Sequence, residues 1–231
     1  MDYRYIMLLM LALALSVWAS IKVNSTFKKY SLVRPRSGIT GAEAARRVLD
    51  ANGLYNVRIE HIHGNLTDHF DPRTNVIRLS DKVYGVSSAA AIGVAAHEAG
   101  HAVQYARGYA PLKLRNAIIP VTNIGSRLAM PLIFLGLIFA GAGTQYISIA
   151  YIGVACFAFS TLFQFLTLPT EFNASRRALD SIERTGLLYG NELTAANKVL
   201  SAAALTYVAA LTVSIIQLLR LISIVGMGRR D

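Results

Sequence analysis

Two histidines and a glutamate fall within five residues of this sequence, in the segment His97-Glu98-Ala99-Gly100-His101. On a helix, residues i and i+4 lie one above the other on the same face, so both imidazoles can reach a single metal ion. Glu98 is then placed to take a proton from a water on that metal. Zinc suits imidazole ligands and lowers the pKa of such a water towards about 7. The pattern therefore predicts a zinc hydrolase with His97 and His101 as metal ligands and Glu98 as catalytic base.

The alternative interpretation of this segment is a pair of core histidines with a charge-paired glutamate. Such a cluster needs a partner for every buried polar group, and a charged glutamate is rarely buried alone. Gly100 costs a helix about 1 kcal/mol relative to alanine, so its presence needs a reason. We expect another segment of the chain to pack closely against Gly100.

A catalytic zinc ion usually has three protein ligands and one open position. A third histidine in the same helix is excluded, because position 107 of the extended motif is Arg107. Downstream, Glu171 is expected to open a helix after an apolar run, with Ser175 on the same face. Two histidines and a glutamate form an established zinc set, whereas the alternative for Glu171 is a carboxylate stabilised by the helix dipole. The upstream candidates are three histidines: His61, His63 and His69.

Composition indicates a membrane protein. Apolar residues make up 54% of the 231 residues and charged residues only 16%, whereas soluble domains carry about 25% charge. Four apolar runs are long enough to cross a bilayer, at residues 6–23, 117–143, 146–168 and 202–226. The first run is interpreted as a retained anchor rather than a cleaved signal peptide, because it is long and its N-terminal flank is weakly basic. The predicted fold class is mainly α and membrane-embedded, with about four transmembrane helices and a small α+β domain.

The formal charge of +10 is concentrated beside the apolar runs. This placement favours contact with lipid headgroups and membrane orientation over nucleic-acid binding, since bases and aromatics do not interleave. Two predicted spans separate His101 from Glu171, so both return to one membrane face. The positive-inside rule assigns that face to the cytoplasm, although Arg229 and Arg230 in the tail argue the opposite. Five bases follow the first run: Lys22, Lys28, Lys29, Arg34 and Arg36.

Residues 24–86 are polar and are expected to fold as a domain. Thr40 and Glu43 have the spacing of a capping box, which predicts a helix from Ala44 to Asn52. Ser87 or Ser88 is expected to cap a buried helix that runs to about Arg107. Two short strands are predicted, at 57–62 and 75–80, with a polar loop at 64–73 between them. Either strand could pair with an extended peptide substrate.

The chain resembles the YugP-like family of bacterial membrane proteins described as neutral zinc metallopeptidases. The resemblance covers most of the chain and rests on four main segments: 67–73 (TDHFDPR), 79–80 (LS), 95–104 (AAHEAGHAVQ) and 168–178 (LPTEFNASRRA). It implies a zincin-like catalytic domain joined to a membrane bundle, Zn²⁺ as cofactor and Glu171 as third ligand. It also makes further residues candidates for supporting the ligands or lining the cleft: Asp68, His69, Ser175 and Arg176.

The expected organisation is an N-terminal transmembrane anchor (1–24), a zincin-like catalytic domain (25–112), a transmembrane hairpin (113–168), a third-ligand helical segment (169–201), and a C-terminal transmembrane helix with a basic tail (202–231). The expected function is a membrane-embedded metalloendopeptidase that hydrolyses peptide or protein substrates, membrane proteins included. One alternative is a catalytically silent zinc-binding scaffold or quality-control adaptor, and another is a lipid or small-amide hydrolase that uses the same zinc-bound water. The intact Glu98 argues against the first alternative, because a scaffold needs no general base.

Overall fold

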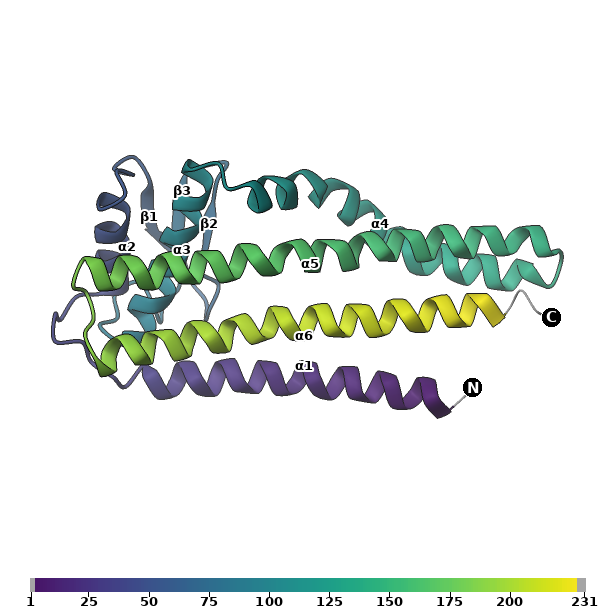
Figure 1. Ribbon diagram of the computed structural model, residues 1–231, viewed down its shortest axis with the longest axis horizontal. Coiled ribbons are helices and arrows are strands. Elements are labelled where there is room, and N and C mark those ends of the chain that lie inside the picture. Colours follow the sequence, from purple (N-terminus) through teal and green to yellow (C-terminus); the bar gives the residue numbers. More distant parts are fainter. Residues whose placement is uncertain (1–2, 228–231) are drawn as a thin grey trace. The chain divides into compact units, whose positions relative to one another are not determined.

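The structure is a computed structural model that describes residues 3–227, and most of these residues are helical (Figure 1). The mainly α fold class with a small α+β part is therefore confirmed. The helices are α1 (Tyr3–Tyr30), α2 (Gly41–Asp50), α3 (Ala89–Ala106), α4 (Ala110–Ala140), α5 (Ile147–Arg184) and α6 (Asn191–Met227), with a short 3₁₀ helix at Thr144–Tyr146. The strands are β1 (Arg58–His61), β2 (His69–Asp71) and β3 (Val76–Leu79).

The chain divides into two compact units. The helical unit comprises Met1–Trp18, Leu114–Leu168 and Tyr207–Asp231. The mixed unit comprises Ala19–Lys113 and Pro169–Thr206, and it contains the whole sheet together with α2 and α3. The long helices α1, α5 and α6 each contribute residues to both units.

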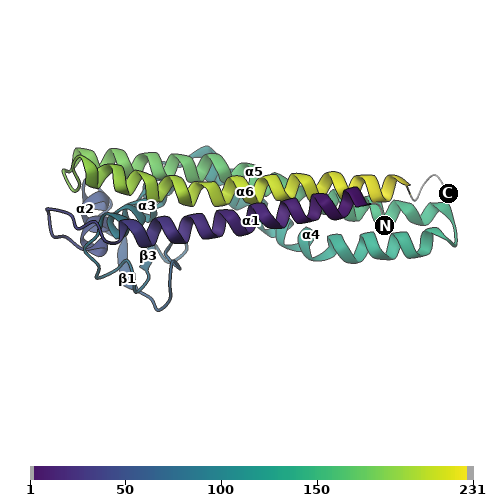
Figure 2. The ribbon, with the colours of Figure 1, turned by 90° about the horizontal axis from the view of Figure 1, so that it is seen from below.

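In the helical unit, α4 and α5 run side by side as a hairpin (Figure 2). Small residues allow the two backbones to approach closely, as is common between membrane helices. A Cβ added to Gly153 on α5 would lie 2.7 Å from the carbonyl oxygen of Ala129 on α4. Gly125 and Gly136 on α4 lie similarly close to the backbone of Cys156 and Ala150. This packing explains why both apolar runs carry glycine.

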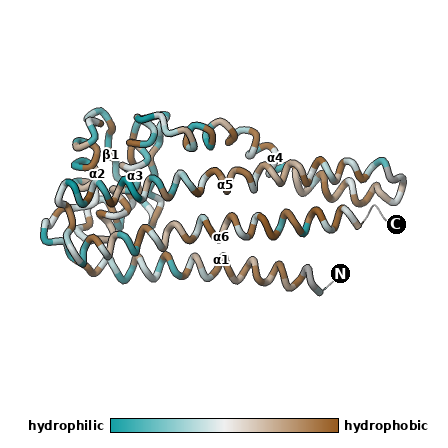
Figure 3. Tube along the Cα trace, in the orientation of Figure 1, coloured by the Kyte–Doolittle hydropathy of each residue, from teal (hydrophilic) through white to brown (hydrophobic). Residues whose placement is uncertain are grey.

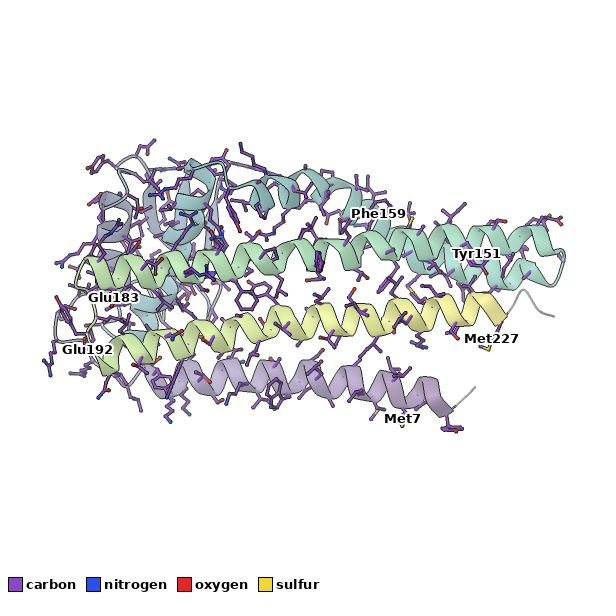
Figure 4. The ribbon with its side chains drawn as sticks, in the orientation of Figure 1. Met7, Tyr151, Phe159, Glu183, Glu192 and Met227 are labelled. Carbon is purple, nitrogen blue, oxygen red and sulfur yellow. The ribbon has the colours of Figure 1, made fainter. Side chains whose placement is uncertain are left out.

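Helices α1, α4, α5 and α6 are long and apolar enough to cross a membrane, as the hydropathy along the trace shows (Figure 3). Large apolar side chains such as Met7, Tyr151 and Phe159 are exposed along these helices (Figure 4). Such continuous apolar exposure would be costly in water and suits a lipid environment.

In the mixed unit, the three strands form one sheet in the order β1-β3-β2. Strand β1 is parallel to β3, with His61 opposite Leu79, and β2 is antiparallel to β3, with Phe70 opposite Ile77. Helices α2 and α3 pack together on a core that includes Val48, Ile77 and Ile92. The capping box at Thr40 and Glu43 is confirmed, and it starts α2 three residues earlier than predicted.

Two secondary-structure expectations are wrong. Strand β2 lies within the segment predicted to be a loop. The sequence did not predict this strand, because three residues of mixed polarity give no periodic signal. Glu171 does not open a helix, because α5 continues through Pro169 without a break. The dipole explanation for Glu171 is thereby removed, since this residue lies far inside the helix.

Candidate metal centre

Helix α3 presents the two histidines of the site. Ser88 caps this helix by accepting a hydrogen bond from the backbone N–H of Ala91, which confirms one of the two predicted caps. The rings of His97 and His101 lie 4.7 Å apart between centroids, with an interplanar angle of 83°. The i, i+4 spacing therefore brings both imidazoles to one face of α3, as the sequence predicts.

Glu171 of α5 meets these two histidines. Its Oε2 atom lies 3.2 Å from Nε2 of His97 and 3.5 Å from Nε2 of His101. The Glu171 side chain is only 4% exposed, and each histidine side chain is 13% exposed. One nitrogen from each histidine and one carboxylate oxygen lie within 4.8 Å of one another. Two imidazoles and a carboxylate are a donor set that fits zinc.

The close approach of α3 and α5 depends on Gly100. A Cβ at this position would lie 2.6 Å from the carbonyl oxygen of Ala174 on α5, too short for a real contact. The expected close packing against Gly100 is therefore present. Ala174 lies between Glu171 and Ser175, so the missing side chain lets these two residues reach the histidines.

Each imidazole has a polar partner on its second ring nitrogen. Nδ1 of His97 lies 3.0 Å from Oγ of Ser175, and Nδ1 of His101 lies 3.0 Å from Oε1 of Gln104. A partner that accepts a hydrogen bond from Nδ1–H leaves the lone pair of a neutral imidazole on Nε2, which is the nitrogen that faces Glu171. Ser175, a candidate from the sequence, and Gln104 are therefore both in position to orient the rings.

Gln104 was missed as a site residue by the reasoning from sequence. Its side chain is fully buried, and its amide nitrogen donates to the carbonyl oxygen of Thr170 at 2.8 Å and to Oδ1 of Asn173 at 3.0 Å. Asn173 Oδ1 also accepts from Nε of Arg177 at 2.7 Å. A polar residue three positions after His101 on a buried helix was the available signal, because a buried amide needs several partners.

The electrostatics of the site favour a proton on His101 when no metal is bound. Burial favours the neutral imidazole, but the hydrogen bond and negative charge of Glu171, helped by Glu98 and Gln104, outweigh burial and raise the pKa of His101. Glu98 is 8% exposed, so its carboxylate is a buried acid close to the second histidine. Paired acids and bases in a buried cluster are typical of functional sites.

The other candidates from the sequence lie elsewhere in the mixed unit. Asp68 accepts hydrogen bonds from the backbone N–H and the hydroxyl of Ser80, at 2.7 and 2.9 Å, so it holds the loop to the end of β3. His69 is exposed and pairs with the carbonyl oxygen of Thr67. Arg176 is exposed on α5. His61 and His63 belong to a separate, exposed cluster with Asp81. Among residues 3–227, none of the three upstream histidines joins the cluster of Glu171.

Comparison with known proteins gives the class of the chain. A protein family described as "Putative neutral zinc metallopeptidase" matches residues 5–226, so the chain belongs to this family. It is also 50% identical over 227 residues to a protein of Bacillus subtilis (strain 168) named "Putative membrane protease YugP", and the match covers 98% of this chain and 99% of that relative. No solved structure matches the chain.

These findings confirm the resemblance drawn from the sequence. The family name points to a zinc metallopeptidase. The relative's name, together with four apolar helices, indicates a multi-pass membrane protein.

Proposed function

We propose that this protein is a membrane-embedded zinc metalloendopeptidase in which His97, His101 and Glu171 hold the metal and Glu98 is the catalytic base. The observation that carries the proposal is the meeting of Glu171 with both histidine Nε2 atoms, at 3.2 and 3.5 Å. When bound, zinc would polarise the peptide carbonyl and would make a water acidic enough to lose a proton at neutral pH, so that its oxygen can attack.

The chain's own residues then supply the proton transfers. Glu98 takes the proton of the attacking water, whose oxygen forms a bond to the peptide carbonyl carbon. Glu98 passes that proton to the amide nitrogen as the C–N bond breaks, so the products are a carboxylate and an amine. Gln104 keeps His101 in the required tautomer, and Ser175 holds the orientation of the His97 ring.

The substrate in this proposal is an extended peptide. Strand β3 is central and paired on both sides, which overturns the expectation that segment 75–80 could pair with a peptide. The edge strands β1 and β2 remain, and β2 adjoins α3, because the ring of Phe70 lies 6.0 Å from that of Tyr105. An extended peptide added to β2 would run beside the helix that bears the histidines.

A mostly apolar cavity supports a preference for apolar side chains. Its volume is about 260 Å³, and it lies between α3 and the turn that connects β2 to β3. Leu54, Val57, Pro72, Ala102 and Tyr105 contribute to its lining. Ala102 and Tyr105 belong to α3, the helix that bears His97 and His101, so we propose this cavity as the binding place of an apolar substrate side chain.

We place residues 25–112 and 169–201 in the catalytic part of this enzyme, and the transmembrane helices within residues 3–24, 113–168 and 202–227. The positive-inside rule puts the catalytic part on the cytoplasmic face. Arg176, Arg177, Arg184 and Lys198 add to the positive charge on this side. The tail residues Arg229 and Arg230, which argued the opposite, lie outside the described residues.

The test of this function compares the parent chain with Glu98→Gln in detergent, using an unfolded fluorogenic protein substrate such as labelled casein. We expect Glu98→Gln to keep its zinc and to cleave at least about a hundredfold more slowly, because the base is lost. Glu183→Gln, which changes an exposed glutamate on α5, is the matched control and should cleave at the parent rate. Full activity in zinc-loaded Glu98→Gln would reject the mechanism. A zinc-loaded parent that cleaves nothing would favour the scaffold.

A further inference from the structure

A second group of metal-binding side chains lies at the surface of the mixed unit. One ligand atom from each of His61, His63 and Asp81 lies within 4.8 Å of the others. Nε2 of His61 is 2.8 Å from Oδ1 of Asp81, and Nδ1 of His63 is 3.5 Å from the same oxygen. We propose that these three residues form a second, accessible site for a divalent transition metal of the zinc class.

The sheet brings the three residues together. His61 ends β1 and His63 follows two residues later, where the chain bends, and the two rings lie 5.4 Å apart between centroids. His61 ends β1 opposite Leu79, and the ladder continues with a hydrogen bond from Ile62 to Leu79. Two residues past Leu79, the chain reaches Asp81, beside the segment that holds His63. The parallel pairing of β1 with β3 therefore brings the three ligands together, although they are separated by up to 20 positions in the sequence.

Two of the three ligands are held in place before any metal arrives. The second oxygen of Asp81 accepts a hydrogen bond from the backbone N–H of Gly64 at 2.9 Å, which turns the first oxygen towards the histidines. The ring of His61 packs edge-on against Tyr84, with 5.4 Å between centroids. Such preorganisation reduces the entropy lost on binding.

The chemistry of the ligands selects the metal. Imidazole with carboxylate suits Zn²⁺, Ni²⁺ and Cu²⁺, whereas Mg²⁺ and Ca²⁺ require oxygen ligands. The His63 side chain is 96% exposed, so water can fill the remaining coordination positions. A metal here would tie the end of β1 to the segment that follows β3, and through His63 it would also fix the loop at 62–68, which connects β1 to β2. This site shares no residue with the cluster of Glu171.

The test counts zinc in the purified full-length chain after gel filtration. We expect about two zinc ions per parent chain. Glu171→Ala and the double variant His61→Ala/His63→Ala should each hold about one, and the triple variant that combines all three substitutions should hold none. Asp81→Asn, which keeps an acceptor for Gly64 but loses the charge, should also lose the exposed ion. His69→Ala removes an exposed histidine outside the cluster and should keep the parent count.

A local readout accompanies the count. In the Glu171→Ala chain, added zinc should slow proteolysis of the 62–68 loop, and added Mg²⁺ should not, because only the metal that binds the folded loop protects it. Removing His61 and His63 should abolish this protection. The proposal is overturned if the double variant keeps the parent zinc count, or if zinc leaves the loop unprotected. Failure of the buried site is distinguishable, since the parent would then hold about one zinc that Glu171→Ala retains.

Discussion

Oε1 of Gln104 lies 3.0 Å from Nδ1 of His101, while the amide nitrogen of the same side chain lies 2.8 Å from the carbonyl oxygen of Thr170. A carbonyl oxygen can only accept, so the contact with Thr170 fixes the orientation of the amide. Oε1 must then accept from His101, and Nδ1 carries the proton. In the neutral imidazole, which is the form that can bind a metal, the lone pair of His101 is then on Nε2, the nitrogen that faces Glu171. One buried amide thus links α5 to the tautomer of a histidine on α3.

Replacing Gln104 tests this positioning role. Gln104→Met has a similar volume but no acceptor, and we expect it to lower the affinity for zinc by about 10- to 100-fold. Competition with a chelating dye measures that affinity. Gln104→Glu keeps an acceptor for His101 and should retain more zinc affinity than Gln104→Met, although it places a charge next to Thr170. Equal loss in both variants would indicate a purely structural role.

Ser175 is expected to act in the same way on His97. Ser175→Ala removes the acceptor at 3.0 Å from Nδ1, so the affinity for zinc should fall, by less than in Gln104→Met because Ser175 is only half-buried. The matched control is Ser201→Ala, since Ser201 is an exposed serine on α6. Unchanged zinc affinity in Ser175→Ala would show that His97 needs no such partner.

Gly100→Ala should separate α3 from α5. Helix propensity alone would favour alanine by about 1 kcal/mol, but the new Cβ would meet the backbone oxygen of Ala174 at 2.6 Å. Backbone cannot rotate away, so we expect a net destabilisation of about 1–3 kcal/mol and faster loss of zinc. Thermal unfolding and zinc release measure the two effects. Gly85→Ala, where nothing lies within 4 Å of the new Cβ, should behave like the parent in both. A stabilised Gly100→Ala chain would contradict the observed packing.

Zinc binding should strengthen as the pH rises. The raised pKa of His101 means that the metal-free chain holds a proton there more tightly than an ordinary histidine would. Zinc must displace that proton, so affinity should increase from about pH 6 to about pH 8. The stability that the protonated His101 gains from Glu171 without metal runs the other way, and is lost as the pH rises through the raised pKa. Calorimetric titration at several pH values measures the first trend, and a flat profile would contradict it.

The orientation of the membrane helices can be tested by cysteine labelling. In a Cys156→Ala chain, Leu32→Cys introduces a thiol at a position that is 83% exposed, in the segment proposed to face the cytoplasm. An impermeant maleimide should label it only after the cells are permeabilised. The proposed orientation places the turn between α4 and α5 outside the cell, so Gln145→Cys in this turn should be labelled in intact cells. The opposite pattern would reverse the orientation.

The sequence was most informative where local rules decide the structure. The capping box at Thr40 and Glu43 and the cap at Ser88 could be predicted, because each depends on residues three positions apart. The shared face of His97 and His101 follows from helical periodicity alone.

Long-range packing decided the rest. Glu171 was expected to open a helix, yet α5 continues through Pro169, because the helix is held by contacts that the local sequence does not reveal. The role of Gln104 depends on Thr170 and Asn173, which lie 66 and 69 positions away. His61 and His63 were considered as ligands of the buried site, because their spacing in the sequence does not show which ligand-type side chains lie near them. The sheet register places them with Asp81 instead.

The central claim is that Glu171 completes a zinc site with His97 and His101. It is tested most directly by zinc content in a His61→Ala/His63→Ala background, in which only the buried site can hold metal. Zinc is counted in this background chain, in the same chain with Glu171→Ala, and in the same chain with the control Glu183→Ala. We predict about one zinc per chain in the background and in the Glu183→Ala combination, and loss of that zinc with Glu171→Ala. A folded background chain without zinc, or zinc kept at full affinity after Glu171→Ala, would contradict the claim.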